Sequence, residues 1–119
     1  MEFEKLALEV SARKAGLTAV KPRVLQGSSG VEHKFDLLFT DGDHFHAFDF
    51  YEEVTDVEVV KSFAKKFDVG CSVSIVSPPG KATEGAQKLA LSYGMRIITP
   101  DAVPTVFALE GAAPQRTFG

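Results

Sequence analysis

The sequence has one cysteine and no tryptophan, and the scarcity of cysteine limits the chemistry open to the chain. With Cys71 alone, a disulfide within the chain and a zinc site built on several cysteines are excluded. We therefore expect a protein of a reducing compartment. Ten phenylalanines supply most of the aromatic bulk instead.

The sequence also lacks long apolar runs and a surplus of positive charge. No apolar run approaches the roughly 20 residues that a helix needs to cross a bilayer. The acidic, amphipathic N-terminus does not have the layout of a signal peptide. We therefore expect a cytoplasmic protein with no membrane partner. The formal net charge of −3 does not favour electrostatic binding of DNA or RNA by the whole surface, although a local basic face is compatible with it.

The composition that remains is that of one globular domain. The 119 residues are 45% hydrophobic and 24% charged, which is ordinary for a soluble domain with one core. We expect residues 1–100 to form this domain. The segment 101–119 should hold one turn of helix around Val106 and Leu109 and then become partly flexible.

Three segments, 2–15, 55–67 and 83–93, have the apolar periodicity of helices. Thr55 and Glu58 have the spacing of a capping box at the start of the second one. The residues predicted to share a face are Phe3, Leu6, Ala7 and Val10 on the buried face of the first helix, Val57, Val60, Ala64 and Phe67 in the second, and Ala86, Leu89, Ala90 and Tyr93 on the inward face of the third.

Short apolar runs between the helices predict strands. They are residues 33–40 and 43–51, joined by a two-residue hairpin turn at Asp41-Gly42, and residues 71–77 and 95–99. Residues 18–26 are a weaker candidate, because Pro22 interrupts them. Helices alternate with strands after Val54, which favours parallel pairing there. The sequence therefore predicts an α/β protein with a central mixed sheet, a β-hairpin within it and helices on both faces.

Each strand of the predicted hairpin carries an aspartate among bulky apolar residues, Asp36 and Asp49. Aspartate is depleted from strands and rarely buried without a partner. A two-residue turn places Asp36 opposite Ala47. It also places Asp49 opposite Lys34. The two aspartates are then diagonal neighbours about 7 Å apart on one face, which Tyr51 shares.

Two interpretations of these aspartates remain open. Two carboxylates at this separation can hold Mg²⁺, which takes oxygen ligands. A metal held there activates water and stabilises a phosphoryl oxygen. Alternatively, Asp49 forms a cross-strand ion pair with Lys34, and Asp36 accepts a hydrogen bond from a helix N-terminus or a loop amide.

Four segments carry a family resemblance through their order and spacing. They are FEKLALEVSARKAGL, GSSGVEHKFDLL, HAFDFY and GAQKLALSYGMRIIT. Together they resemble the restriction-endonuclease-like PD-(D/E)xK nuclease superfamily, in its Mrr-type branch, over about residues 3–99. The resemblance implies the fold of that superfamily and a site in which Glu4, Asp36 and Asp49 are the acidic residues. It also implies Mg²⁺ as the cofactor and DNA or RNA as the partner.

The lysine of that superfamily is absent from its place. It should lie two residues after Asp49, where this chain has Tyr51, and a neutral hydroxyl is a poor replacement for a cation. Lys34 is one candidate stand-in, because the predicted register places it opposite Asp49. The other candidates are the lysines of the predicted second helix, Lys61, Lys65 and Lys66, since superfamily members sometimes carry the lysine on a helix. A solvated helix face is the interpretation that we favour for these three.

Two functions follow from these residues. The loss of the lysine favours a catalytically degenerate nuclease-like module that serves in nucleic-acid association or oligomerisation. The retention of both aspartates favours an active Mg²⁺-dependent endonuclease with a migrated lysine. Because a domain of this size buries only about two-thirds of its unfolded surface, we also expect a homodimer formed through an apolar helix or an edge strand.

Overall fold

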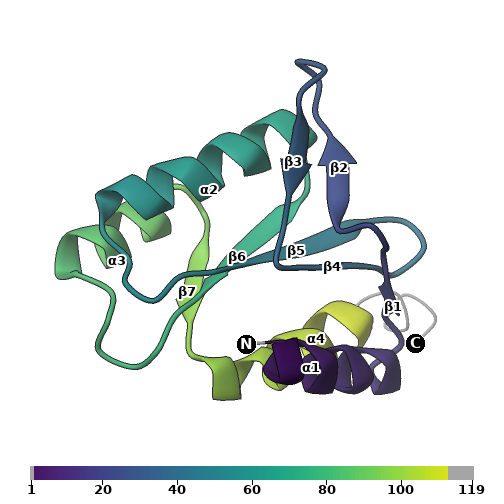
Figure 1. The fold of residues 1–119 in the computed structure, drawn as a ribbon. Helices are drawn as coiled ribbons and strands as arrows, with labels where there is room; N and C mark the ends of the chain where they lie inside the picture. Colours follow the sequence, from purple (N-terminus) through teal and green to yellow (C-terminus); the bar gives the residue numbers. More distant parts are fainter. Residues whose placement is uncertain (1, 113–119) are drawn as a thin grey trace.

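The computed structural model describes the backbone of residues 2–112 and the side chains of residues 5–109. Its elements in chain order (Figure 1) are α1 (Glu2–Lys14), β1 (Thr18–Ala19), β2 (Val24–Gln26), β3 (Glu32–Lys34), β4 (Leu37–Thr40), β5 (Phe45–Phe50), α2 (Asp56–Val69), β6 (Ser72–Val76), α3 (Glu84–Ser92), β7 (Arg96–Ile98), η1 (Pro100–Ala102) and α4 (Val103–Ala112). No helix in this part of the chain is long and apolar enough to cross a bilayer.

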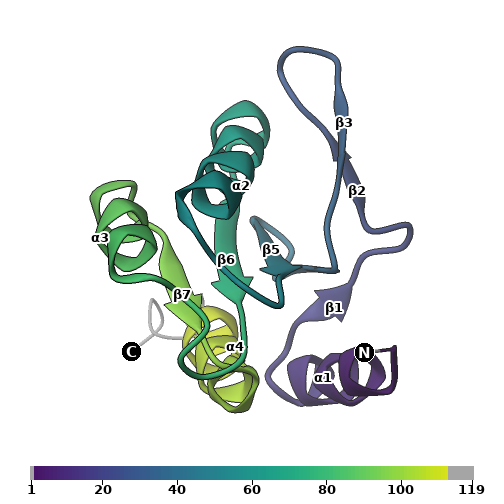
Figure 2. The same cartoon turned by 60° about the vertical axis from the view of Figure 1, so that its left-hand side comes forward.

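A five-stranded mixed sheet runs through the middle of the molecule. Its strand order is β1-β4-β5-β6-β7, in which β4 pairs antiparallel with β5 and β6 pairs parallel with both β5 and β7. Helices α2 and α3 cover one face of the sheet, and α1 and α4 cover the other (Figure 2). The expected central mixed sheet with a hairpin and with helices on both faces is therefore confirmed.

Helices α1, α2 and α3 begin and end within two residues of the predicted positions. The capping box is present at the start of α2, where the Thr55 side chain accepts a backbone hydrogen bond and the Glu58 carboxylate accepts one from the Thr55 N–H. Gly70 ends α2 at φ 69°, in the left-handed conformation that glycine adopts without strain.

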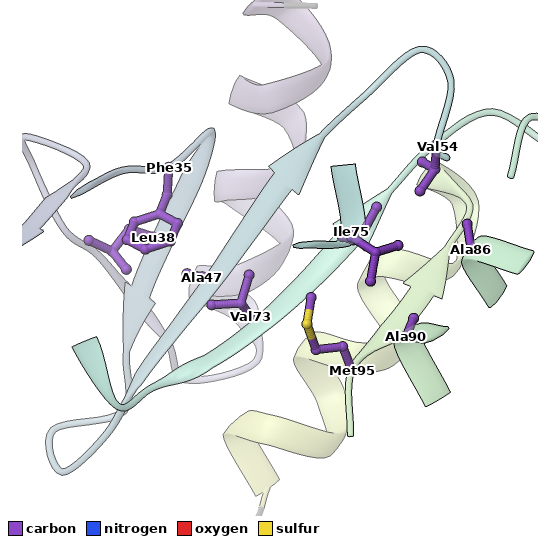
Figure 3. Packing of buried hydrophobic residues seen from close by; sticks show 10 residues of the cluster. Phe35, Leu38, Ala47, Val54, Val73, Ile75, Ala86, Ala90 and Met95 are labelled. Atoms are coloured by element: carbon purple, nitrogen blue, oxygen red, sulfur yellow. The ribbon is translucent and has the colours of Figure 1, made fainter. Parts of the chain in front are cut away.

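Each face of the sheet has its own hydrophobic core, because strand side chains alternate between the faces. In β4, Leu38 points toward α2 and α3, whereas Leu37 and Phe39 point toward α1 and α4. The labelled residues of the first core in Figure 3 are Phe35, Leu38, Ala47, Val54, Val73, Ile75, Ala86, Ala90 and Met95. In the second core, the rings of Phe39 and Phe48 each meet the Phe107 ring edge to face.

The hairpin between β4 and β5 has a longer turn than the sequence predicts. The prediction of a two-residue turn at Asp41-Gly42 is therefore wrong. Leu38, rather than Asp36, pairs with Ala47. The register of the two strands is thus shifted by two residues from the predicted one. A shift of two leaves the side chains within the strands on their predicted faces, because the alternation has a period of two.

Asp41 explains the longer turn. Its carboxylate accepts hydrogen bonds from the backbone N–H groups of Asp43 and His44, both at 2.8 Å, and lies 2.9 Å from Nε2 of His46. The hydrogen bond with His46 is the main cause of a lowered pKa of Asp41, and it outweighs the opposing effect of burial. Asp41 is therefore ionised at neutral pH and organises the loop.

The chain bends at Asp36 and splits the predicted strand 33–40 into β3 and β4. β3 pairs with β2 in a separate two-stranded sheet, where Lys34 lies opposite Val24. The prediction that Lys34 faces Asp49 is therefore wrong, since the pairing partner of Lys34 belongs to another sheet. The bend also turns Phe35 into the first core, on the side of the sheet that faces α2.

The β2–β3 hairpin projects beyond the main sheet (Figure 1) and is held near the end of α2 by Asp68. The Asp68 carboxylate accepts hydrogen bonds from the N–H and the hydroxyl of Ser29, and it lies 2.7 Å from Nε2 of His33. These contacts, led by the Ser29 hydroxyl, lower the pKa of Asp68 to about 2. Gly27 permits this approach, because a Cβ there would overlap the Asp68 carboxylate.

The predicted buried face of α1 is wrong. Leu6, Ala7 and Val10 are exposed, and the side chain of Phe3 lies outside the described residues. Ala12 packs on the second core instead. The inward side of α1 also carries Lys5 and Glu9, which form ion pairs with residues of the connections between the strands. These charges hold the helix in its observed orientation.

The apolar stripe of α2 also points to solvent. Its members Val57, Val60, Ala64 and Phe67 are all exposed. The buried residues of α2 are Val59 and Ser62. In α3, by contrast, Ala86 and Ala90 are buried and Leu89 and Tyr93 are partly buried, as predicted.

Helix α4 is longer than the single turn expected around Val106 and Leu109. It spans Val103–Ala112, and Val103, Val106 and Phe107 are buried in the second core. The segment thus covers one face of the sheet together with α1. Residues 113–119, which were expected to be partly flexible, lie outside the described residues.

We predict that Asp41→Ala lowers the free energy of unfolding by about 2–3 kcal/mol at neutral pH, because three donors lose a charged acceptor. The pKa of Asp41 is lower in the folded protein than its ordinary value of 3.8. Its contribution is therefore complete above that value and declines as the pH falls below it. Urea unfolding at about pH 7 and about pH 2.5 should show a smaller difference between wild type and variant at the lower pH. An equal difference at both would contradict this role, and Asp43→Ala is the matched control.

Candidate functional site

Asp49 is a buried carboxylate in β5, a central strand of the sheet. Its side chain is 3% exposed and points toward α2. Ser62 Oγ donates to Oδ2 at 2.6 Å, and Lys65 Nζ donates to Oδ1 at 2.9 Å. A buried carboxylate is destabilising unless it is paired and hydrogen-bonded. The two donors from α2 meet that requirement.

Lys65 is the cation that balances Asp49. Its ammonium also donates to the carbonyl of Lys34 at 2.7 Å and lies 4.9 Å from the centroid of the Phe35 ring. The favoured prediction of a solvated face is therefore wrong for Lys65, whereas Lys61 is exposed as that prediction requires. Lys34, the other candidate, contributes its carbonyl rather than its ammonium to this contact.

Tyr51, which stands where the sequence resemblance leads us to expect a lysine, joins the cluster through Ser62. Its hydroxyl lies 2.9 Å from Ser62 Oγ. Ser62 has one hydroxyl proton and donates it to Asp49, so Tyr51 is the donor in its own hydrogen bond with Ser62. Burial raises the pKa of Tyr51, and the negative charges of Asp49 and Asp36 add to this effect. Tyr51 therefore keeps its proton at neutral pH.

Asp36 lies at the bend before β4, at the same end of β5 as Asp49. Its Oδ2 accepts a hydrogen bond from the backbone N–H of Phe50, the residue after Asp49, at 2.7 Å. Its Oδ1 lies 3.1 Å from Nζ of Lys5 in α1. The Asp36 side chain is 35% exposed, and Lys5 is mostly buried beside it. Asp36 is thus the open carboxylate of the pair and Asp49 the buried one.

The fold brings the two aspartates to one end of β5, each with a lysine from a different face of the sheet. Every carboxylate oxygen of the pair accepts a hydrogen bond from a donor of this chain. Among the described side chains, no group of three or more His, Cys, Asp and Glu residues is placed to hold a metal ion. The side chain of Glu4, the third predicted acid, lies outside the described residues.

Sequence reasoning missed two residues of this cluster, Ser62 and Lys5. Ser62 interrupts the apolar residues of α2, and its spacing of three from Lys65 places both on one side of the helix. That spacing was the available signal, but the larger apolar stripe on another side of α2 obscured it. Lys5 follows Glu4 in the first helix, and its contact with Asp36 spans 31 residues. No local pattern predicts a contact over such a separation.

We predict that Lys65→Met lowers the free energy of unfolding by about 2–4 kcal/mol, because the buried Asp49 carboxylate loses its cation. Adding Asp49→Asn should restore part of the loss, since a neutral amide needs no cation. Urea unfolding of both single variants and the double variant measures the coupling between the two residues. Lys61→Met removes an exposed lysine of the same helix and should change little. A double variant whose loss of unfolding free energy equals the sum of the two single losses would contradict the ion pair.

Comparisons with known proteins find similarity in structure and not in sequence. No family model matches the chain, and no curated protein matches it. Among solved structures, a repair endonuclease from Pyrococcus abyssi is similar, with a TM-score of 0.51 and 18% sequence identity. The similarity covers 82% of this chain and 45% of the endonuclease chain, so this chain spans less than half of that protein.

At this identity the similarity concerns the fold alone. Together with the central mixed sheet and the helices on both of its faces, this similarity shows that the fold of this chain is restriction-endonuclease-like.

Proposed function

We propose that this chain is a metal-dependent phosphodiester hydrolase that acts on DNA or RNA, with Lys65 in the role of the superfamily lysine. The observation that carries the proposal is the 2.9 Å contact between Lys65 Nζ and the buried Asp49 carboxylate. This contact supplies a cation beside the motif aspartate, although position 51 holds a tyrosine. The nuclease-like fold supports the same class of reaction.

Mg²⁺ is the proposed cofactor, and Asp36 and Asp49 are its proposed ligands. Both offer carboxylate oxygens, and Mg²⁺ commonly binds through one or two carboxylates together with waters and substrate phosphates. The exposure of Asp36 leaves that carboxylate accessible, and each oxygen has a second lone pair beside the one that it already uses. When bound, such an ion activates water and stabilises charge on a phosphoryl oxygen. Glu4 remains a proposed third acidic residue.

Lys65 is the residue proposed to contact the substrate phosphate. An ammonium has three N–H donors, and Lys65 uses two of them on Asp49 and on the Lys34 carbonyl. The third can donate to a phosphoryl oxygen as negative charge develops there. A donor held in place before the reaction stabilises that charge without reorganisation.

Ser62 and Tyr51 are proposed positioning residues. Ser62 holds the second oxygen of Asp49, and Tyr51 in turn donates to Ser62. The raised pKa of Tyr51 keeps this chain of donors protonated at neutral pH. Asp49 therefore keeps one orientation, which a site for catalysis requires.

A catalytically degenerate module is the second candidate, and a different observation favours it. All four carboxylate oxygens of Asp36 and Asp49 already accept hydrogen bonds from this chain. A site satisfied in this way is stable without a metal, as a scaffold that associates with nucleic acid would be.

We expect the protein to cleave DNA or RNA in the presence of Mg²⁺ or Mn²⁺ and not in EDTA. Lys65→Met should lower the rate about 10²–10³-fold, the usual loss when a group that stabilises developing charge is removed. Asp49→Asn should also lower the rate, because it removes a proposed ligand of the metal. Lys61→Met is the matched control, because it removes an exposed lysine from the same helix, and it should cleave at the wild-type rate. Gel electrophoresis of end-labelled strands measures the rates.

Two outcomes would separate the candidates. An inactive wild type that gains cleavage on Tyr51→Lys, which restores the motif cation, would support the degenerate module. Metal binding provides a second measurement, because Mg²⁺ should raise the free energy of unfolding by about 2.7 kcal/mol at a hundredfold excess over Kd. Asp36→Asn should abolish that rise. A wild type that neither cleaves nor gains stability with metal contradicts the hydrolase.

We also propose that the chain forms a homodimer through the exposed stripe of α2. Val57, Val60 and Phe67 in this stripe are 56%, 48% and 80% exposed. With Ala64 they follow alternate spacings of three and four residues, by which one helix packs against another. A second copy presents the same stripe, so the contact is self-complementary.

Light scattering at micromolar concentration should therefore give twice the chain mass of 12.9 kDa. Phe67→Glu should return the mass to that of one chain, because it buries a charge in the contact. Leu6→Glu is the control, since Leu6 is similarly exposed on α1, on the other face of the sheet. A wild type that is monomeric throughout this range would refute the dimer.

A further inference from the structure

A basic groove adjoins the site at the base of the β2–β3 hairpin. We infer that this groove binds the sugar-phosphate backbone of the nucleic acid and directs the strand toward Asp36 and Asp49, an inference that rests on the proposed function. The groove is an open cavity of about 340 Å³. Its lining residues are Lys21, Pro22, Arg23, Val24, Lys34 and Phe35.

Two segments of the chain supply the three cations of the groove. Lys21 and Arg23 lie in the connection between β1 and β2, and Lys34 is the last residue of β3. The pairing of Val24 with Lys34 holds these segments side by side. Three cations around one cavity create a local field that attracts anions, although the whole chain carries a net charge of −3.

One carboxylate, Glu9 of α1, partly balances these cations. It lies 2.8 Å from Nζ of Lys21 and 3.1 Å from a guanidinium nitrogen of Arg23. Burial opposes ionisation of Glu9, but the hydrogen bonds from Lys21 and Arg23 outweigh it and lower its pKa. Glu9 therefore stays ionised at neutral pH. Three cations less one carboxylate leave an excess of two positive charges at the groove.

The cations of the groove retain capacity for a ligand. Lys34 is exposed and uses its carbonyl, not its ammonium, in the contact with Lys65. The side chain of Lys21 is 54% exposed. The side chain of Arg23 is 23% exposed, and its contact with Glu9 uses one guanidinium nitrogen. Phosphate oxygens are strong acceptors for such donors.

The groove and the site share the chain segment that runs from Lys34 to Asp36. Phe35 lies in the groove wall and is followed directly by Asp36. The carbonyl of Lys34 accepts the hydrogen bond from Lys65, the cation that balances Asp49. A backbone whose phosphates bind in the groove thus extends toward the two aspartates, which favours a strand of nucleic acid over a small anion.

The test measures binding in EDTA, where cleavage does not interfere. Fluorescence anisotropy of a labelled single strand and a duplex over a salt series gives the slope of log K against log salt. Lys21→Gln combined with Lys34→Gln should make that slope shallower by about 0.7–0.9 for each phosphate that the variant no longer neutralises. Lys14→Gln combined with Lys88→Gln removes the same charge from exposed positions of α1 and α3 and should leave the slope nearly unchanged.

A second measurement separates the groove from the hydrolase. Bis(p-nitrophenyl) phosphate is a small phosphodiester without flanking phosphates. With Mg²⁺, the groove variant should hydrolyse it at the wild-type rate but lose cleavage of long strands. A wild type that fails to hydrolyse it and also fails to cleave nucleic acid would count against the hydrolase. The dependence of binding on salt, measured in EDTA, would still test the groove independently.

An unchanged slope in the groove variant would overturn the inference, as would a wild type that binds neither strand. Heparin that competes as strongly as DNA of the same charge would also overturn it, because the surface would then bind any polyanion. If circular dichroism shows a lower melting temperature for the double variant than for the wild type, Lys34→Gln alone replaces it. Lys34 is exposed, and the contact of its carbonyl with Lys65 does not need its side chain.

Discussion

The buried carboxylate of Asp49 is the constraint on which the rest of the site depends. β5 lies inside the sheet, so this charge cannot reach water and must be balanced from α2. Ser62 and Lys65 do so, and that requirement sets the rotation of α2 about its axis. The apolar stripe of the helix is then left outside, where it is available to a second copy. One electrostatic demand thus accounts for both the cluster and the exposed stripe.

The β2–β3 hairpin connects this cluster to the basic groove. The bend at Asp36 takes the chain out of the main sheet, and Asp68 holds the far end of the hairpin near α2. Lys34 lies at the junction, with its carbonyl bonded to Lys65 and its side chain at the groove. An acidic chain thereby acquires a local positive surface next to two carboxylates. The net charge of the whole sequence does not reveal such a surface, because it does not say where in the fold each charge lies.

The same ion pairs serve both proposed functions. In a hydrolase, Lys5 and Lys65 balance Asp36 and Asp49 until a metal and a phosphate arrive. In a degenerate module they balance them permanently. The two functions differ in whether the carboxylates bind Mg²⁺ more favourably than they bind the donors of the protein. The affinity of the two carboxylates for Mg²⁺ therefore distinguishes a hydrolase from a degenerate module. Tyr51 belongs to both cases, because its hydroxyl supports Asp49 through Ser62 whether or not catalysis occurs.

Local sequence was enough to predict helices α1, α2 and α3, the sheet type and the strand that carries Asp49, because caps, glycine stops and apolar alternation act over a few residues. It did not predict the bend at Asp36, which divides the expected strand 33–40 into β3 and β4. It failed at the hairpin turn, where the Asp41 side chain stabilises a longer loop. It also failed at Lys65, which is 16 residues from Asp49. The tertiary structure alone decided that pairing, since α2 is rotated so that its donors reach the buried Asp49 carboxylate and its apolar stripe stays exposed. An unpaired buried carboxylate destabilises a fold more than a few exposed apolar side chains do.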